Sequence, residues 1–535
     1  MKGDDELASD DESMLQVEKD FHIACKQNNI EKVKHFLNKR RVQVNSVNLL
    51  WGAYGMLRRP SVNQSSGQTA LHWAVGSGND EVVNILMQNK ANADLQDKYG
   101  MNSLHLAAWF GHLEILRHLV MSGGDISRRN MNGYSLLHCA VRQGHLPIIK
   151  YIVEDLFSLK PKDVTKDGKT SFLLAAEYGH ADVLSFLMNH GLKLSDVDTA
   201  GNTILHLAAK NGYSHVMEEL FFPDEESEQQ RITKKLIDAK NENGDATLHV
   251  AAENGHTECV RLLLESDAVC QINICNKENR IALHLAVKNG NEKLARLLID
   301  KGIELDAQDE KQKTCLHLAA ENNLPIMIKF LLQKGCNMRI VDDRGQTALH
   351  LAAESGFLDI ADLLIVAGSH LKVQDKQNKD PLQVAVRADQ VHMVDMLIKA
   401  QLYFTWKEMT EAEYRPPKYI SFKPDHSAET QHLRNLLWEM ANSRLSQTDW
   451  HRLALHFGFT EKHLEAIECQ WIGKKSHKEH AHRMLLIWLH RELVTTANPM
   501  KNMFEGLLVG LSRRGLADEF RRNAEQKREK PCKMS

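Results

Sequence analysis

Short apolar segments alternate with polar loops as far as about residue 400, and the apolar positions have helical spacing. One segment starts at Thr69-Ala70-Leu71-His72, and a second, Val82-Val83-Asn84-Ile85-Leu86, follows a glycine. Apolar residues that recur at intervals of three and four lie on one face of a helix. The pattern therefore predicts pairs of helices, each pair joined by a tight turn and separated from the next by a polar loop.

A histidine returns at a fixed interval and defines a repeat. Two runs share an interval of 33 residues: His72, His105 and His138, then His284, His317 and His350. Between the runs the register slips, with Leu173 in place of a histidine before His206. About ten repeats extend from His72 to Gln383, and a degenerate one lies upstream around Phe21. A fixed interval of this length is typical of stacked supersecondary units.

Helix-start and helix-stop residues accompany each register position. Three places earlier stand residues that cap helix N-termini: Thr69, Asn102, Ser135, Thr170, Thr203, Thr314, Thr347 and Asp380. Ala246 and Ile281 break this rule, so we expect their helices to fray more easily. Six places after the register stand residues that tolerate a left-handed backbone: Gly78, Gly111, Gly144, Gly179, Gly212, Gly255, Gly290 and Gly356, with Asn28, Asn323 and Asp389 elsewhere.

The segment Gly345-Gln346-Thr347-Ala348-Leu349-His350-Leu351-Ala352-Ala353 resembles the ankyrin repeat, whose pattern is Gly-x-Thr-Pro-Leu-His-x-Ala-Ala. It departs only at Ala348, where the family has proline. The resemblance covers residues 17–400 and implies an all-α solenoid that binds a protein in its groove. Residues 45–67 and 221–235 interrupt the repeats, and we expect both insertions to be surface loops.

A different apolar pattern begins at about residue 430 and predicts six short helices, hence an antiparallel bundle. The residues Trp450-His451-Arg452-Leu453-Ala454, Phe457-Gly458, Ile467-Glu468, Ser476, Met484-Leu485 and Trp488 resemble a death domain. The predicted organisation is an acidic disordered arm (1–16), the repeats (17–400), a linker or capping segment (401–429), a death domain (430–522) and a basic tail (523–535). This order resembles ankyrin repeat and death domain-containing proteins.

Composition narrows the function. A net charge of -3 and a pI near 6.9 give no reason to expect nucleic acid as a partner. Nine cysteines without a pairing pattern, and the lack of a signal peptide or an apolar run long enough to span a bilayer, favour a cytoplasmic location. Phosphate-binding loops, metalloprotease, hydrolase and kinase motifs are missing, so we expect neither an enzyme nor a cofactor.

Aromatic residues near the predicted groove are candidate partner contacts. They are Tyr99, Trp109, Phe110, Tyr134 and Tyr178, of which Trp109 and Phe110 lie four and five places after His105. Exposed aromatics in neighbouring repeats bury large areas at low entropic cost. The alternative is that Trp109 or Phe110 packs between repeats.

Charged residues of the second module form two candidate faces for head-to-tail contacts between death domains. Positive residues are Arg444, Arg452, Lys474 and Lys475, and negative ones are Glu461 and Glu465. An ordinary solvated surface is the alternative. At the C-terminus, Cys532 begins a sequence that fits the prenylation frame, although Lys533 suits it poorly. We therefore expect membrane attachment only if Cys532 is prenylated.

The histidines do not predict a metal centre. The register histidines suit hydrogen bonds to the N-cap or to a neighbouring repeat, and His477, His480 and His482 do not converge as zinc ligands usually do. The leading hypothesis is a non-catalytic signalling adaptor whose groove binds a protein and whose death domain contacts other death domains. The alternatives are a passive scaffold or sequestering inhibitor, and an enzyme with an unrecognised site.

Overall fold

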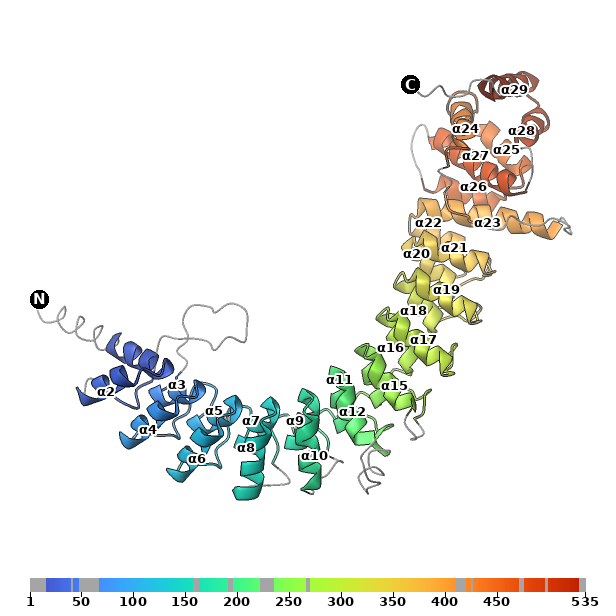
Figure 1. Cartoon of the computed structure of the whole chain (residues 1–535). Coiled ribbons are helices and arrows are strands. Elements are labelled where there is room, and N and C mark those ends of the chain that lie inside the picture. The colour runs from blue at the N-terminus through green and yellow to red at the C-terminus, as the bar shows by residue number, and fades with distance from the viewer. Residues whose placement is uncertain are drawn as a thin grey trace, which may run out of the picture. The chain divides into compact units, whose positions relative to one another are not determined.

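The computed structural model describes residues 16–39, 42–47, 67–156, 163–190, 196–221, 235–265, 270–409, 420–424, 427–470, 476–495 and 499–528. The chain forms two compact parts, Met1–Lys277 and Glu278–Ser535. Both are built from helices (Figure 1). Within the described ranges there is no β-strand, only one antiparallel bridge between Val47 and Thr69.

Helices of the N-terminal part alternate between two rows. The first row is α3 (Ala70–Gly76), α5 (Ser103–Phe110), α7 (Leu136–Gln143), α9 (Ser171–Tyr178), α11 (Ile204–Asn211) and α14 (Thr247–Glu253). The second row is α2 (Ile30–Asn38), α4 (Asp80–Gln88), α6 (Leu113–Met121), α8 (Leu146–Lys150) continued by η1 (Tyr151–Asp155), α10 (Ala181–Asn189), α12 (Ser214–Phe221) and α15 (Thr257–Glu265). Each first-row helix packs on the next one along the chain, as stacked repeats require.

Burial differs between the rows as the sequence pattern predicts. Six consecutive residues of α5, Ser103–Ala108, are buried because the helix contacts α3, α6 and α7. In α4 only Val82, Val83 and Leu86 are buried, which is one face of the helix. A buried aliphatic side chain contributes roughly 1.5–3 kcal/mol, so each repeat is stabilised mainly by the repeats on either side.

The register histidine fastens the start of its own helix to the next repeat. His72 Nδ1 accepts the backbone N–H of Thr69 at 3.0 Å and lies 2.8 Å from the Thr69 hydroxyl oxygen. Its Nε2 lies 3.1 Å from the Met101 carbonyl oxygen and is therefore the protonated nitrogen. His206, His317 and His350 make the same contacts. His105 differs at the cap, where its Nδ1 lies 2.5 Å from the side-chain oxygen of Asn102, while its Nε2 lies 3.2 Å from the Tyr134 carbonyl oxygen. The structural role predicted for these histidines is confirmed.

The predicted helix stops are also confirmed. All eight glycines in that position have φ between 68° and 85°, and Asn28, Asn323 and Asp389 have φ of 56°, 54° and 53°. Backbone bonds then join the tips of successive loops, for example Met131 N–H to the Tyr99 carbonyl and Lys166 N–H to the Asn132 carbonyl, both at 3.0 Å.

The C-terminal part begins with four more helix pairs. Their first helices are α16 (Ala282–Lys288), α18 (Cys315–Glu321), α20 (Ala348–Ser355) and α22 (Pro381–Arg387), and their second helices are α17 (Glu292–Asp300), α19 (Pro325–Gln333), α21 (Leu358–Val366) and α23 (Val391–Met409). Helix α23 continues through residues 401–409, at the start of the segment that the sequence predicts to be a linker or a capping segment, and Leu402 and Tyr403 extend its buried face.

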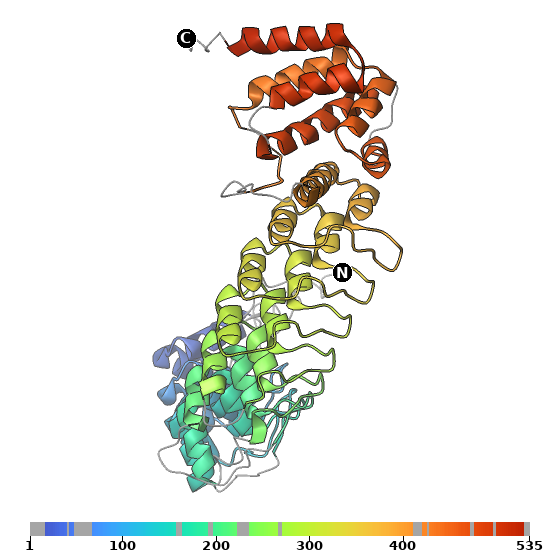
Figure 2. The ribbon, with the colours of Figure 1, turned by 90° about the vertical axis from the view of Figure 1, so that its right-hand side faces the viewer.

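A bundle follows, and it is seated on α22 and α23 (Figure 2). Its helices are α24 (Gln431–Ser443), α25 (Gln447–His456), α26 (Glu461–Glu468), α27 (Ser476–Thr495), α28 (Pro499–Glu505) continued by η2 (Gly506–Gly510), and α29 (Arg514–Arg528). Trp450 and Trp488 are each 1% exposed and form its centre.

Several expectations fall outside the described residues. These are the acidic arm up to residue 15, most of both insertions (48–66 and 222–234), Lys474, Lys475 and Cys532. Among the helices that are described, none is long and apolar enough to cross a bilayer.

Candidate functional site

Three of the predicted aromatics surround one arginine in the N-terminal part. Arg142 lies on α7, and its Cζ is 4.9 Å from the ring centroids of both Trp109, in the preceding repeat, and Tyr178, in the following one. Tyr134 is the third, with its ring centroid 5.6 Å away. Arg142 Nη1 donates to the Tyr134 hydroxyl at 3.5 Å. We call these four residues the aromatic–arginine cluster.

Regular stacking produces this cluster. Trp109 and Arg142 each stand four places after a register position, and Tyr178 stands five places after Leu173. Residues at equivalent positions of stacked repeats become lateral neighbours. Two histidines bond to the backbone of the cluster residues: His145 Nε2 lies 2.9 Å from the Trp109 carbonyl oxygen, and His180 Nε2 lies 3.1 Å from the Arg142 carbonyl oxygen.

Burial separates the members of the cluster. Trp109, Arg142 and Tyr178 are half-buried, and Trp109 packs against Arg142 of the next repeat while it still reaches solvent. The exposure expected of Tyr134 was wrong, since this residue is only 8% exposed. Its ring meets His138 edge-on, and burial raises the pKa of its hydroxyl to about 12. Tyr134 therefore forms the base of the cluster.

The other two predicted aromatics, Tyr99 and Phe110, contact residues other than Arg142. Tyr99 is 57% exposed on a loop tip, with Lys98 Nζ 4.9 Å from its ring centroid. Phe110 is half-buried and stacks on His112, with ring centroids 6.4 Å apart. Sequence reasoning did not select Arg142, although its place in the same register as Trp109 was a usable signal.

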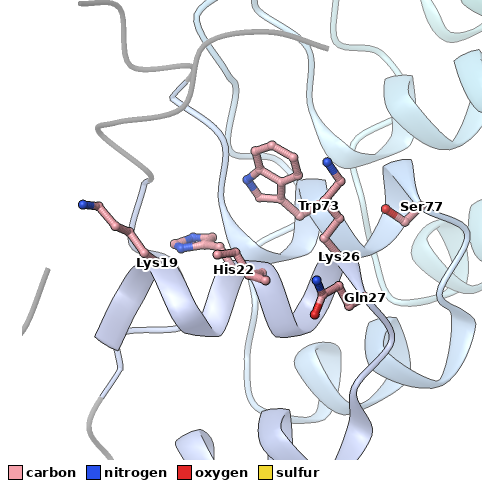
Figure 3. A pocket seen from close by; sticks show the side chains of 7 residues that line it. Lys19, His22, Lys26, Gln27, Trp73 and Ser77 are labelled. Atoms are coloured by element: carbon pink, nitrogen blue, oxygen red, sulfur yellow. The ribbon is translucent and has the colours of Figure 1, made fainter. Parts of the chain in front are cut away.

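A pocket of about 370 Å³ lies at the start of the same row of helices (Figure 3). Lys26 approaches the face of Trp73, with Nζ 5.0 Å from the ring centroid. Lys19 and His22 line the pocket from the same helical segment as Lys26. The position equivalent to Trp109 in this repeat is Gly76, so no side chain fills the row at that point.

On the bundle, the predicted charged residues differ in their surroundings. Arg444 pairs with Glu519 of α29, so this arginine is engaged within the bundle. Arg452 on α25, and Glu461 and Glu465 on α26, are exposed. These three side chains face solvent while the bundle packs against α22 and α23.

Another face of the bundle is buried against the last repeat. Arg483 of α27 donates to Asp395 of α23 through Nη2 at 2.6 Å and Nε at 3.1 Å. His463 Nε2 lies 2.7 Å from Gln401 Oε1, and burial lowers the pKa of this histidine to about 4. The segment 420–424, which precedes the bundle, contacts α21 of the previous repeat, since Phe422 N–H donates to Asp362 at 2.7 Å.

Within the described part of the chain, no group of three or more His, Cys, Asp or Glu residues is placed to hold a metal ion. Burial raises the pKa of Cys25 and Cys139 to about 12, which keeps these thiols protonated and unreactive. A stacked guanidinium with flanking aromatic rings is instead suited to polar and apolar contacts with a protein.

Comparison with known proteins agrees with the repeat architecture. In the XBAT33 E3 ubiquitin-protein ligase of Arabidopsis thaliana, 119 aligned residues are 29% identical and cover 19% of this chain and 23% of that protein. In the human transient receptor potential cation channel subfamily A member 1, 117 aligned residues are 28% identical and cover 21% of this chain and 10% of that protein. The chain thus spans less than a quarter of the length of these relatives.

A solved structure is also similar. The crystal structure of the ankyrin repeat domain of Bcl-3, a member of the IkappaB family, is 27% identical, with a TM-score of 0.36, and the match covers 41% of this chain and 95% of that one. The model of the family "Ankyrin repeats (3 copies)" matches residues 21–130, 137–231, 225–309 and 316–405. Since these ranges make up most of the sequence, the chain belongs to the family of ankyrin-repeat proteins.

Proposed function

We propose that this chain is a non-catalytic adaptor that binds one protein on its repeats and another through its C-terminal bundle. The observation that carries the first half is the aromatic–arginine cluster. Trp109, Arg142 and Tyr178 come from three successive repeats and are all partly open to solvent. Clusters of tryptophan, tyrosine and arginine are typical centres of protein interfaces.

For the second half, we propose that residues 430–522 are a death domain. The six helices and the burial of Trp450 and Trp488 support this assignment, together with the sequence resemblance. Arg452 on one helix and the pair Glu461 and Glu465 on the next offer opposite charges on an exposed surface. Opposite charges on different faces permit head-to-tail association with a second death domain.

The packing of the bundle against α22 and α23 supports an alternative function, that of a scaffold or a sequestering inhibitor. Arg483 and His463 face α23 and are therefore withheld from other partners. If the contacts of the bundle were restricted to this internal docking, the chain would be a scaffold or a sequestering inhibitor without self-assembly. The two functions differ in whether the exposed charges of α25 and α26 are used.

Charge reversal of the full-length chain tests the proposal. We expect light scattering across a concentration series to show self-association that weakens about tenfold in Arg452→Glu or Glu465→Arg. Mixing the two variants should restore assembly, because each supplies the charge that the other lacks. A chain that stays monomeric at every concentration would favour the sequestering role. Assembly that is unaffected by either variant would show that these charges do not mediate it.

A further inference from the structure

Arg142 is a cation that lies against aromatic rings and has no acidic partner in the described part of the chain. There, its one hydrogen-bond acceptor is the Tyr134 hydroxyl, at a long 3.5 Å, and it takes part in no ion pair. The neighbouring lysine differs, since Lys169 Nζ lies 2.6 Å from Glu177 Oε1. Arg142 is therefore a cation of this surface that forms no ion pair with a carboxylate of the described residues.

The aromatic rings orient this charge. A guanidinium has five N–H donors in one plane, and rings against its faces leave only the edge for hydrogen bonds. Trp109 and Tyr178 lie at the same distance from Cζ, 4.9 Å, and belong to repeats on opposite sides of α7. Restricting the guanidinium between two rings lowers the entropic cost of pairing it with an anion.

We propose that Arg142 receives the carboxylate of an Asp or Glu side chain in the protein that binds the repeats. This inference rests on the binding role proposed above and names the partner's chemistry. A carboxylate matches the edge of a guanidinium with two parallel hydrogen bonds. The half-exposed rings of Trp109 and Tyr178 then accept an apolar residue next to the acid.

The local charges favour a carboxylate over a phosphate. A phosphate group carries about two negative charges and is commonly held by several cations. Here Lys169 is paired with Glu177, so the cluster offers the single charge of Arg142, which one carboxylate balances.

A library of random peptides displayed on phage, selected on the full-length chain, tests this assignment. We expect the selected peptides to share an acidic residue beside an apolar one. A synthetic peptide from this set should lose at least about tenfold in affinity on Arg142→Gln. Replacing its acid by the matching amide should cost as much, and the two changes together should cost little more than either alone.

Two variants serve as controls. Lys210→Gln removes an exposed charge from the equivalent register position of α11 and should leave the affinity within about twofold. Arg142→Lys keeps the charge but loses the planar edge, so it should still bind more weakly than the native chain. The circular dichroism melting curve of each variant establishes that the repeats remain folded.

The outcomes separate this inference from the proposed function. Peptides that bind but need no acid, or that are unaffected by Arg142→Gln, would overturn the carboxylate assignment and leave protein binding in place. A phosphoserine peptide that binds more than tenfold better than the acidic peptide would also overturn it. Binding only after removal of residues 1–15 would overturn it too, because the chain's own acidic residues would then occupy Arg142 in place of a partner. If no peptide is retained by the native chain in preference to Trp109→Ala, protein binding at this surface fails as well.

Discussion

Arg483 in the bundle and Asp395 in the last repeat form a two-point ion pair across the surface where these elements meet. The side chain of Arg483 is 6% exposed and that of Asp395 is 19% exposed. Arg483 also donates to Gln470 at 2.8 Å, so the buried guanidinium has hydrogen-bond acceptors in both the bundle and the last repeat. The two partners stand 88 positions apart in the sequence. The bundle is thus attached to the last repeat by more than the chain itself.

We expect Asp395→Asn to loosen this docking. Removing the charge leaves Arg483 buried without an anion, which costs about 2–3 kcal/mol for a pair that is not fully buried. Hydrogen exchange of the full-length chain should then accelerate in α26 and α27. Asp343→Asn, which removes an exposed carboxylate in a repeat loop, is the matched control and should leave α26 and α27 unchanged. Equal protection of both helices in the two variants would show that the ion pair does not hold the bundle.

The repeats could be predicted in detail because each structural requirement returns at the same register. Thr347 and His350 occupy positions whose capping role is local, so the sequence pattern was sufficient. The contact of Arg142 with Trp109 and Tyr178 depends on the lateral placement of three helices, which no single repeat specifies. The burial of Lys399 in α23 likewise depends on the packing of α27, which lies far along the chain.

Acidification should destabilise the repeats through their buried histidines. Burial lowers the pKa of His138 from 6.5 to about 4, so the unfolded chain binds more protons than the folded one between these values. Stability is therefore fully present above pH 6.5 and is lost as the pH falls toward 4. From pH 7.5 to 5.0 the loss due to one such histidine is about 2 kcal/mol.

His138→Gln should reduce this pH dependence without breaking the capping geometry. The chain already uses glutamine at the register of α22, where Gln383 Oε1 accepts the N–H of Asp380 at 3.2 Å. His138 Nε2 is buried without a hydrogen-bond partner among the described residues, so little else is lost. Hydrogen exchange of α7 at pH 7.5 and 5.0 measures the effect. An unchanged difference between the two pH values would mean that His138 does not titrate in this range.

Cysteine reactivity should follow burial. Cys469 is exposed, whereas Cys25 and Cys139 are buried with the pKa of each thiol raised to about 12. The thiolate is the reactive form, so alkylation of the native chain by iodoacetamide should be at least about tenfold faster at Cys469. Peptide mass spectrometry over a time course gives the individual rates. Alkylation of Cys139 as fast as that of Cys469 would indicate that the first-row helices open readily.

The helix start at Ala246 offers a way to strengthen one repeat. Only half of the cap is present there: His249 Nδ1 accepts the Ala246 N–H at 3.1 Å, but no hydroxyl is available for the helix. Threonine fits this position elsewhere, since Thr314 and Thr347 are 2% and 4% exposed in the same place. Ala246→Thr should therefore stabilise α14 by about 1 kcal/mol, and the reverse change Thr347→Ala should destabilise α20 by a similar amount.

Because repeats respond locally, hydrogen exchange within α14 and α20 measures the free energies of these two changes separately. The control in the same chain is Ile281, the other position without a capping side chain, whose helix α16 should be unaffected by either substitution. A loss of protection in α14 on Ala246→Thr would mean that the fully buried methyl of Ala246 leaves no room for the larger side chain. In that case the departure from the capping pattern at this repeat reflects tight packing and not a weak helix start.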